Sequence, residues 1–401
     1  MKIVKPKYYD NFICEAADCT FTCCQDWKIT VDAATKKRWQ KMPLPPGMKS
    51  RKKHLTDFVR MGDGGDEMIL NKDGKCPFLD KDLLCHLVKT YGEGCLSHTC
   101  HTFPRETHEH DLRTEYALSA GCPAVLRLLW KEARFSVEEQ DCDAQPAKKD
   151  APETPEYLFE IRDWFMNFIQ NESERIPTLL QVMFYFALDM LEKEEQAPLS
   201  EKDVNEYREK ALIKEVFSII QGMEINRLET FLEQNELLLD LAENYRKKKI
   251  YSDYLEPIAK HAEAYERLLA EHENAGEVAE DFAQELLEKY DGFLEQFQDY
   301  LPKLRLLLAE EIYSACLLPE GDLYSMVMKL QWIAMEYAVI CQWSFLHFDL
   351  YKELTEESFL QLVAVIFRMT GYSEADIEEY LDNSFDSIIW EWGYFALITG
   401  K

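Results

Sequence analysis

The spacing of hydrophobic residues divides this chain into two parts of different character. From about residue 155 onward, apolar residues recur every three to four positions, as on the buried face of an amphipathic helix. Long segments of this kind with short connectors are typical of a bundle or of stacked helical pairs. The stretch 325–346 is apolar on nearly all sides, so we expect it to be the central helix. The predicted helices include 157–169, 179–195, 227–249, 281–297 and 323–343.

The front part of the chain shows short, irregular patterns broken by frequent glycine and proline. This punctuation indicates loops held by cross-links rather than long elements. Turn residues, an aspartate cap and a helix-ending glycine define the expected elements. These are a strand within 5–14, a helix capped by Asp32 within 29–42, a hairpin over 62–79 that turns at Asp73–Gly74, a helical turn ending at Gly92, and a helix over 124–135.

A segment rich in proline, alanine and charge, "DAQPAKKDAPETPE", separates the two parts. Such composition is typical of a linker. We therefore predict a cysteine-rich domain over 1–142, a linker over 143–156 and an acidic helical domain over 157–401. The predicted fold class is mainly α, with a small irregular metal-binding N-terminal domain followed by an all-α bundle.

Charge is unevenly distributed between these parts. The first 150 residues carry 24 Lys and Arg against 23 Asp and Glu, whereas the remainder carries 21 against 51, a net charge of -30. An acidic field disfavours nucleic acid and anionic membranes and could attract a cationic partner, although it also simply keeps helices soluble. We see no signal peptide and no apolar run long enough to cross a membrane, so we expect a cytoplasmic protein with reduced thiols.

Cysteine is concentrated in the front part, which holds ten of the twelve. Closely spaced thiolates chelate because one loop can direct two sulfur atoms at one ion. Structural zinc often uses two Cys-x2-Cys pairs, which this chain lacks, whereas iron–sulfur clusters accept wider spacing. The pattern therefore favours an iron–sulfur cluster, with zinc as the alternative. Some cysteines could instead be small buried residues, as we expect for Cys316 and Cys341. His86, His98 and His101 flank cysteines and could also ligate.

The order of these residues resembles a known family. "C-x4-C-x3-CC-x2-W-x-I", then "CPFL…LC", "C-x4-C…FPR" and "CP", all within residues 8–125, resemble the flagellin lysine-N-methylases and, more broadly, zinc- or iron-chelating proteins with a Cys-x-x-Cys-x-x-Cys-Cys signature. The chain departs from that signature because three residues separate Cys19 from Cys23. The resemblance implies as ligands Cys19, Cys23, Cys76, Cys85, Cys95 and Cys100, with Cys24 and Cys122 next, and Cys14 fitting less well.

The resemblance also implies an activity. It is the transfer of methyl groups from S-adenosylmethionine to lysine side chains of flagellin, in an enzyme with a bound cluster of 4Fe-4S type. Such a displacement needs alignment and desolvation of the amine, and aromatic faces can hold the cationic sulfonium. The glycines of "MGDGGDE" have no following helix and indicate a plain turn, and Cys19-x3-Cys23-Cys24 lacks the Cys-x3-Cys-x2-Cys loop of radical enzymes. We therefore expect an atypical donor pocket between the cysteine-rich domain and the helices.

Few residues can be given roles in catalysis from sequence. Arg105 could bind the carboxylate of the methyl donor in a two-pronged contact, or it could pair with an acidic residue and fix its loop. We expect Trp27 to cover the metal site. Asp26 and Asp32 lie nearby, but neither receives a role, and the catalytic residues are not identified by the sequence.

Two other functions remain open. The first is a non-enzymatic metal protein, such as a scaffold, sensor or chaperone. The second is a thiol redox enzyme, which no Cys-x2-Cys pair supports. Flagellin is the expected partner of the leading function, and the sequence predicts no oligomeric state.

Overall fold

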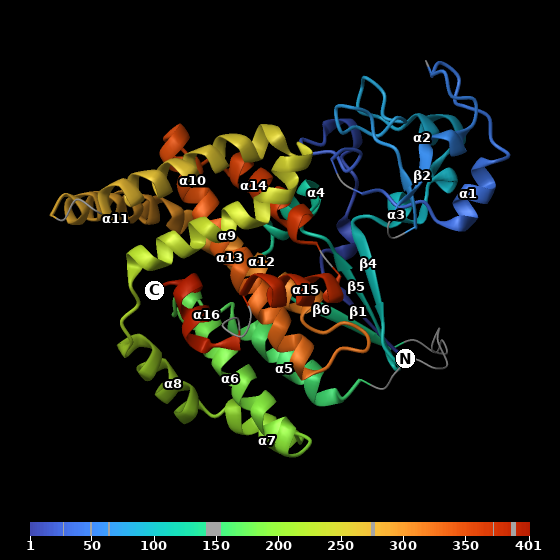
Figure 1. Cartoon of the computed structure of the whole chain (residues 1–401). Coiled ribbons are helices and arrows are strands. Elements are labelled where there is room, and N and C mark those ends of the chain that lie inside the picture. The colour runs from blue at the N-terminus through green and yellow to red at the C-terminus, as the bar shows by residue number, and fades with distance from the viewer. Residues whose placement is uncertain are drawn as a thin grey trace.

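The structure, a computed structural model, describes residues 1–26, 28–48, 50–62, 65–141, 154–273, 277–371, 373–385 and 390–401. A large helical body fills one side of the molecule, and a smaller lobe, built from the early part of the chain, stands at its upper right in Figure 1. A sheet lies between them. Trp27 and all but the last three residues of the segment predicted as a linker lie outside the described residues.

The predicted mainly α class is confirmed, since helices make up most of the described chain. All the long helices expected from apolar spacing are present, as α5 (Glu156–Phe168), α6 (Ile176–Gln196), α9 (Arg227–Lys248), α11 (Glu277–Phe297) and α13 (Leu323–Tyr351). The body also contains α4 (Pro123–Leu129), α7 (Glu201–Tyr207), α8 (Lys210–Gly222), α10 (Ser252–Glu273), α12 (Leu301–Ala315), α14 (Glu356–Thr370), α15 (Glu374–Phe385) and α16 (Trp392–Thr399). No described helix is long and apolar enough to cross a membrane.

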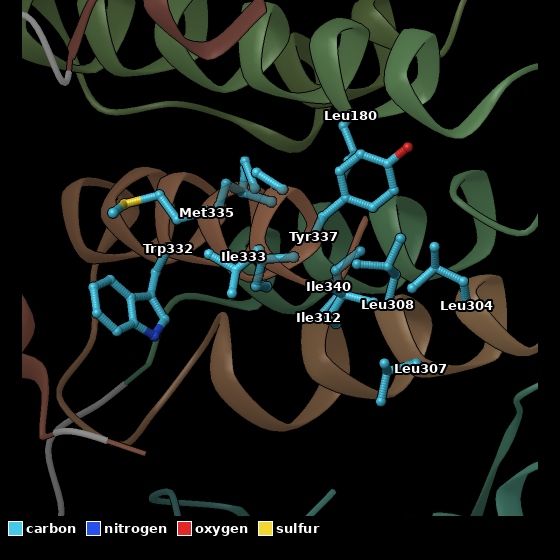
Figure 2. Close-up of a cluster of buried hydrophobic side chains, with 14 of the residues drawn as sticks. Leu180, Leu304, Leu307, Leu308, Ile312, Trp332, Ile333, Met335, Tyr337 and Ile340 are labelled. Atoms are coloured by element: carbon cyan, nitrogen blue, oxygen red, sulfur yellow. The ribbon is translucent and has the colours of Figure 1, made fainter. Parts of the chain in front are cut away.

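Helix α13 is the centre of the helical body, as its apolar surface predicts. Almost every residue from Leu323 to Leu346 is buried. Figure 2 shows its side chains, including Ile333 and Tyr337, together with leucines of α12 and with Leu180 of α6. Cys316 and Cys341 are buried in this core, so the expectation that they are core residues is confirmed.

A four-stranded sheet that the sequence did not reveal packs against the helices. Its strand order is β4 (Arg105–Glu109), β5 (Arg113–Leu118), β1 (Lys2–Pro6) and β6 (Val137–Asp141). Strand β1 is parallel to β5 and antiparallel to β6, and β4 is antiparallel to β5. These strands come from distant parts of the chain, and Tyr313 of α12 joins two of them by donating to the carbonyl oxygens of Val4 (3.2 Å) and Tyr116 (3.1 Å).

The smaller lobe, which we call the cysteine lobe, covers residues 22–102 between β1 and β4. It contains α1 (Ala33–Trp39), the hairpin of β2 (Val59–Gly62) and β3 (Gly65–Met68), α2 (His86–Tyr91) and α3 (His98–Thr102). It has a hydrophobic core of its own, in which the rings of Trp39 and Phe58 pack on Phe78. Residues before and after the lobe belong to the core of the helical body.

In the front part of the chain, the predictions that depend on a single residue at a helix end are confirmed. The predictions that depend on which strands pair are wrong. Asp32 caps α1, and Gly92 ends α2 at a φ of 78°. The predicted strand at 5–14 is wrong, because the strand is Lys2–Pro6, where β5 offers a partner, and a 3-10 helix follows at Tyr9–Asn11. The predicted hairpin is also wrong, because β3 pairs with the preceding β2 and Lys75 pairs with Gln25.

A buried ion pair fastens the sheet to the helices. Arg162 of α5 is fully buried and donates from both terminal nitrogens to the carboxylate of Glu115 on β5, at 2.5 and 2.9 Å. The Arg162 guanidinium and that of Arg113 hold the pKa of Glu115 below its usual value against the opposite effect of burial. A buried charge needs such a partner.

Replacing Arg162 by methionine should therefore destabilise the fold strongly. The variant leaves the buried Glu115 carboxylate without its bidentate partner, which typically costs about 3–5 kcal/mol. Arg227→Met, which removes an exposed ion pair with Asp291, should change the free energy of unfolding by less than about 1 kcal/mol. Urea unfolding of both variants tests this, and equal losses would contradict the role of the buried pair.

Carboxyl groups are also buried on α12 and on α13. Glu310 is 1% exposed and Glu336 is 4% exposed. Burial raises the pKa of Glu336 to about 7 and that of Glu310 well above its usual range. The folded protein therefore binds the proton of Glu336 more tightly than the unfolded chain does, and this difference stabilises the fold. The stabilisation is complete at a pH below the pKa of Glu336 in the unfolded chain. It is lost as the pH rises through the pKa of Glu336 in the folded protein.

Glu336→Gln should remove this pH dependence at one position. Relative to the variant, the original protein should lose about 3 kcal/mol of unfolding free energy between pH 4.5 and pH 7, since each pKa unit corresponds to about 1.4 kcal/mol. Urea unfolding of both proteins across this range measures the difference. Parallel stability curves would show that Glu336 does not titrate in this way.

Candidate metal centre and adjoining cavity

Backbone pairing in the cysteine lobe places distant cysteines next to one another. The amide of Cys76 donates to the carbonyl oxygen of Cys24 at 2.7 Å, beside the Gln25–Lys75 bridge. The chain then turns back, so that Leu79 pairs with Cys85 and the amide of His86 donates to the carbonyl oxygen of Phe78 at 2.7 Å. Cys85 consequently returns towards Cys76 as the N-cap of α2.

A third segment brings Cys100 to the same place. Asp32 caps α1 by accepting from the amide of Thr35 (2.8 Å), and its other oxygen accepts from the amide of His98 (2.9 Å) at the start of α3. These amides, that of His98 foremost, lower the pKa of Asp32 to about 2. One carboxylate thus fixes α3, and Cys100 with it, to α1.

The thiols of Cys23, Cys24, Cys76, Cys85 and Cys100 act on one another electrostatically. A hydrogen bond with Cys24 lowers the pKa of Cys23 to about 7 and raises that of Cys24 far above its usual value. Burial raises the pKa of Cys76 to about 12 and that of Cys100 to about 11, and neighbouring thiols add to both. Burial also raises the pKa of Cys85, with a contribution from Cys23. We call these five residues the thiol cluster.

The other predicted ligands lie around this cluster at different places. Burial raises the pKa of the Cys19 thiol and that of Cys122, the latter to about 12, and the neighbouring Cys23 thiol adds to both shifts. Cys95 is buried in the core of the lobe, where its thiol donates to the carbonyl oxygen of Gly92 at 3.0 Å. Cys14 is exposed. Their roles as ligands stay predictions.

The donor chemistry of the thiol cluster fits a soft metal or an iron–sulfur centre. In the described part of the chain, no three Cys, His, Asp or Glu side chains are arranged so that they would already hold a metal ion. The five thiols are nevertheless neighbours drawn from separate loops, which is the donor type that iron–sulfur clusters and zinc bind as thiolates. Burial keeps most of them protonated, and a bound cation would favour their deprotonation.

Arg368 of α14 holds the first cysteine loop against the helical body. Its guanidinium donates to the carbonyl oxygens of Phe21 (2.7 Å), Thr22 (2.9 Å) and Gly121 (2.8 Å). It also lies over the ring of Phe21, 3.8 Å from the ring centroid. The same side chain therefore fixes the segments on either side of the cluster, just before Cys23 and just before Cys122.

A cavity of about 1040 Å³ opens beside the thiol cluster, between the cysteine lobe and the helical body. The lobe contributes Gln25 and Asp26, directly after Cys24, and the hairpin and loop over 60–62 and 67–74. The body contributes residues 248–254, where α9 ends and α10 begins. Its volume reaches the upper end of the range typical of ligand sites, about 300–1,000 Å³.

Burial raises the pKa of Asp26, the half-buried carboxyl group of this cavity, and the charges of Asp73 and Asp253 add to that effect. Arg368 acts in the opposite direction. Tyr251 and Tyr254 line the cavity behind it, and both rings pack on Phe21, at 5.5 and 5.3 Å between centroids. Carboxylate, lysine and aromatic side chains thus line the same cavity.

Arg105 lies away from this cavity. It begins the outer strand β4, is exposed, and its guanidinium lies 4.8 Å from the ring centroid of Phe12. Its predicted role in binding a carboxylate stays a prediction. His86 is half-buried at the start of α2, and His98 and His101 are exposed on α3.

Sequence reasoning missed Tyr251 and Tyr254, which line the cavity from the helical body, and Arg368, which holds the loop beside it. They lie at least 151 residues from the thiol cluster along the chain, in segments whose helical pattern indicates only packing. The expectation of a pocket between the cysteine-rich domain and the helices agrees with the position of the cavity. Gly62 and Gly65 of "MGDGGDE" pair at the ends of β2 and β3.

Comparison with known proteins relates this mainly helical chain to curated Salmonella proteins. Lysine-N-methylases of Salmonella choleraesuis (strain SC-B67) and Salmonella typhimurium (strain LT2) are each 26% identical to it over 187 residues, 46% of this chain and 47% of theirs. The flagellar biosynthetic protein FliU of Salmonella muenchen is 32% identical over 124 residues, 31% of this chain and 73% of FliU. No family model and no solved structure matches the chain.

The fold and site define a helical protein that carries a cysteine-rich lobe with a cavity at its base. Because the chain covers 73% of FliU at 32% identity, it belongs to the FliU family. Its similarity to the lysine-N-methylases is more distant, and the chain spans about half the length of these relatives.

Proposed function

We propose that this protein transfers methyl groups from S-adenosylmethionine to lysine side chains of flagellin. The curated relatives supply the reaction class and the flagellar setting by their names, lysine-N-methylase and flagellar biosynthetic protein. The observation that carries the proposal is the cavity of about 1040 Å³ at the junction of lobe and body. It is large enough to enclose a nucleoside donor together with a side chain of a protein substrate.

The lining of the cavity suits the two reactants. Lys248 and Lys249, exposed at the end of α9, can neutralise the carboxylate of the donor. Tyrosine rings can contact the cationic sulfonium. A substrate that fills the cavity would displace water and hold the amine behind the methyl group, and these two effects supply most of the rate in such a displacement.

We further propose that the thiol cluster holds a metal centre, an iron–sulfur cluster of 4Fe-4S type or, as the alternative, zinc. Cys23, Cys24, Cys76, Cys85 and Cys100 would supply the ligands, with Cys19, Cys95 and Cys122 as additional thiols that act electrostatically on members of the cluster. When bound, such a centre would cross-link the loops of the lobe, as metals do in small loop-rich folds. Gln25 and Asp26 follow Cys24 directly, so fixing this loop fixes one wall of the cavity.

Cys76→Ser should lower the metal content of the purified protein to less than half, because serine cannot replace a thiolate ligand of a soft metal. Cys316→Ser, a change in the helical core, is the matched control and should retain the metal. Elemental analysis and the visible absorption of anaerobically purified protein measure both. A full metal content in Cys76→Ser, or equal loss in both variants, would contradict the assignment.

The activity is tested by incubating the protein with S-adenosylmethionine and flagellin, aerobically and anaerobically. We expect a mass gain on flagellin in steps of one methyl group at lysine residues, found by mass spectrometry of peptides. Flagellin whose lysines have been acetylated is the control and should gain none. No methylation in either atmosphere, with the metal present, would reject the enzymatic function and favour a metal-binding scaffold or sensor.

A further inference from the structure

The cysteine lobe differs in charge from the rest of the chain. Residues 22–102 carry 14 Lys and Arg against 10 Asp and Glu, whereas the other residues carry 31 against 64. The basic residues of the lobe are themselves concentrated, because residues 33–56 contain eight Lys and Arg and neither Asp nor Glu. A strongly cationic stretch thus belongs to an otherwise acidic molecule.

The fold turns this stretch into a fixed surface. Trp39 is buried, and its indole nitrogen donates to the carbonyl oxygen of Cys95 at 2.8 Å. The hydroxyl of Tyr91 donates to the carbonyl oxygen of Pro43 at 2.9 Å. Three apolar side chains of the loop after α1 pack on the core of the lobe, namely Met42, Leu44 and Met48. The apolar residues of the stretch therefore anchor it, and its charged residues are left at the surface.

Five cations of the stretch are exposed, and we call them the basic face. They are Lys37 and Arg38 of α1, Lys41 directly after it, and Arg51 and Lys53 in the loop. Helix α1 contacts the 3-10 helix Leu55–Phe58, so the loop end that carries Arg51 and Lys53 returns towards α1. In Figure 1, α1 lies on the side of the lobe that is turned away from the helical body.

No carboxylate neutralises the basic face within the described structure. None of its five side chains has an Asp or Glu partner at ion-pair distance there, whereas the adjacent Lys36 is paired with Asp66 at 2.6 Å. Asp57, the first acidic residue after the stretch, accepts instead from the main-chain amides of Lys53 (2.9 Å) and His54 (3.0 Å). The positive charge of the face is therefore available to a partner.

Stability of the fold does not explain this arrangement. The C-terminal end of α1 carries partial negative charge, which favours cations in its last turn, but this effect fades beyond that turn and does not extend to Arg51 and Lys53. Lys37 and Lys41 are four positions apart, the spacing at which like charges on a helix repel each other. Contact with negative charge from outside would relieve this repulsion.

The charge of the remaining molecule selects the kind of polyanion. A nucleic acid or an anionic membrane presents negative charge over an area larger than the lobe, so it would also meet the acidic helical body, which repels it. A short acidic segment of a protein can cover the basic face without approaching the body. The surface therefore fits an acidic polypeptide segment.

The basic face is connected to the cavity through the β2–β3 hairpin. The ion pair of Lys36 with Asp66 joins α1 to β3, and the same hairpin lines the cavity with Arg60, Met61 and Glu67. A polypeptide bound on the basic face would therefore need to cross this hairpin to place a side chain in the cavity.

We propose that the basic face binds an acidic segment of the protein substrate while a lysine of the same substrate enters the cavity. This assignment deepens the proposed function and rests on it for the identity of the substrate. Binding of the acidic segment itself requires no methyl donor. The lysines selected for methylation are then those that lie near sequence rich in Asp and Glu.

A fluorescein-labelled peptide of alternating glutamate and alanine tests the assignment by fluorescence anisotropy with the full chain. At low ionic strength the original protein should bind it about tenfold more tightly than the matching peptide of glutamine and alanine, and added salt should remove the difference. Lys37→Glu/Lys41→Glu should lose this preference, because it replaces attraction by repulsion. Lys37→Arg/Lys41→Arg should keep it.

Lys210→Glu/Lys214→Glu on α8 is the matched control, with the same residue types, spacing and change in charge at exposed positions outside the lobe. It should keep the preference, and thermal unfolding checks that both charge-reversed variants fold. No preference in the original protein, or equal loss in the two variants, would overturn the assignment. Tighter binding of a labelled oligothymidylate than of the glutamate peptide would also overturn it, in favour of a nucleic-acid surface.

The methylation assay separates failure of this assignment from failure of the proposed function. Lys37→Glu/Lys41→Glu should raise KM for flagellin about tenfold and leave kcat nearly unchanged, because the basic face lies outside the cavity. If this variant methylates flagellin with the KM of the original protein, the function stands and the docking role is rejected. If the glutamate peptide binds the basic face but the original protein methylates nothing, the acidic-segment site stands and the activity is rejected.

Discussion

The hydrogen bonds of Arg368 fix the point at which the chain passes from the helical body into the cysteine lobe, two parts that have separate hydrophobic cores. The side chain leaves α14, in the helical body, and binds main-chain carbonyl oxygens of residues 21, 22 and 121. A guanidinium suits this task because its N–H donors form a rigid planar fork that can engage several acceptors at once. Arg127 holds the segment that leads into the lobe, since it bridges Glu15 (2.7 Å) and Glu357 of α14 (2.9 Å). The position of the thiol cluster over the body depends on these contacts.

The cavity is a consequence of this junction. Neither core encloses it alone, because one wall is the loop that follows Cys24 and the other is the turn between α9 and α10. A site made by two cores is open to a protein side chain and still backed by buried groups such as Tyr251. Cys24 and Asp26 belong to the same loop. A metal centre held by the thiol cluster would not line the cavity, but it would fix this loop and therefore the position of one cavity wall.

The sheet shows how distant segments are combined. Strand β1 lies between β5 and β6, which follow it by more than a hundred residues, and buried charge at Glu115 and Arg162 then ties the sheet to α5. Short strands with little alternation carry a weak signal, since their partners supply most of the stabilising contacts. The hairpin was mispredicted for the same reason, because Asp73–Gly74 forms a turn whose return strand pairs with Gln25 instead of with β3.

The sequence by itself determined the features that depend on near neighbours. Apolar residues at helical spacing specify α5, α6, α9, α11 and α13, Asp32 caps a helix that begins at the next residue, and the cysteines are concentrated in the front part. Only the tertiary structure decided which thiols meet at Cys23, where the cavity lies, and that Asp26 and Tyr251 both line it while Arg368 holds the loop beside them. Spacing along a helix or a turn is a local property, whereas those meetings depend on hydrogen bonds and packing between residues that lie from 52 to 347 positions apart.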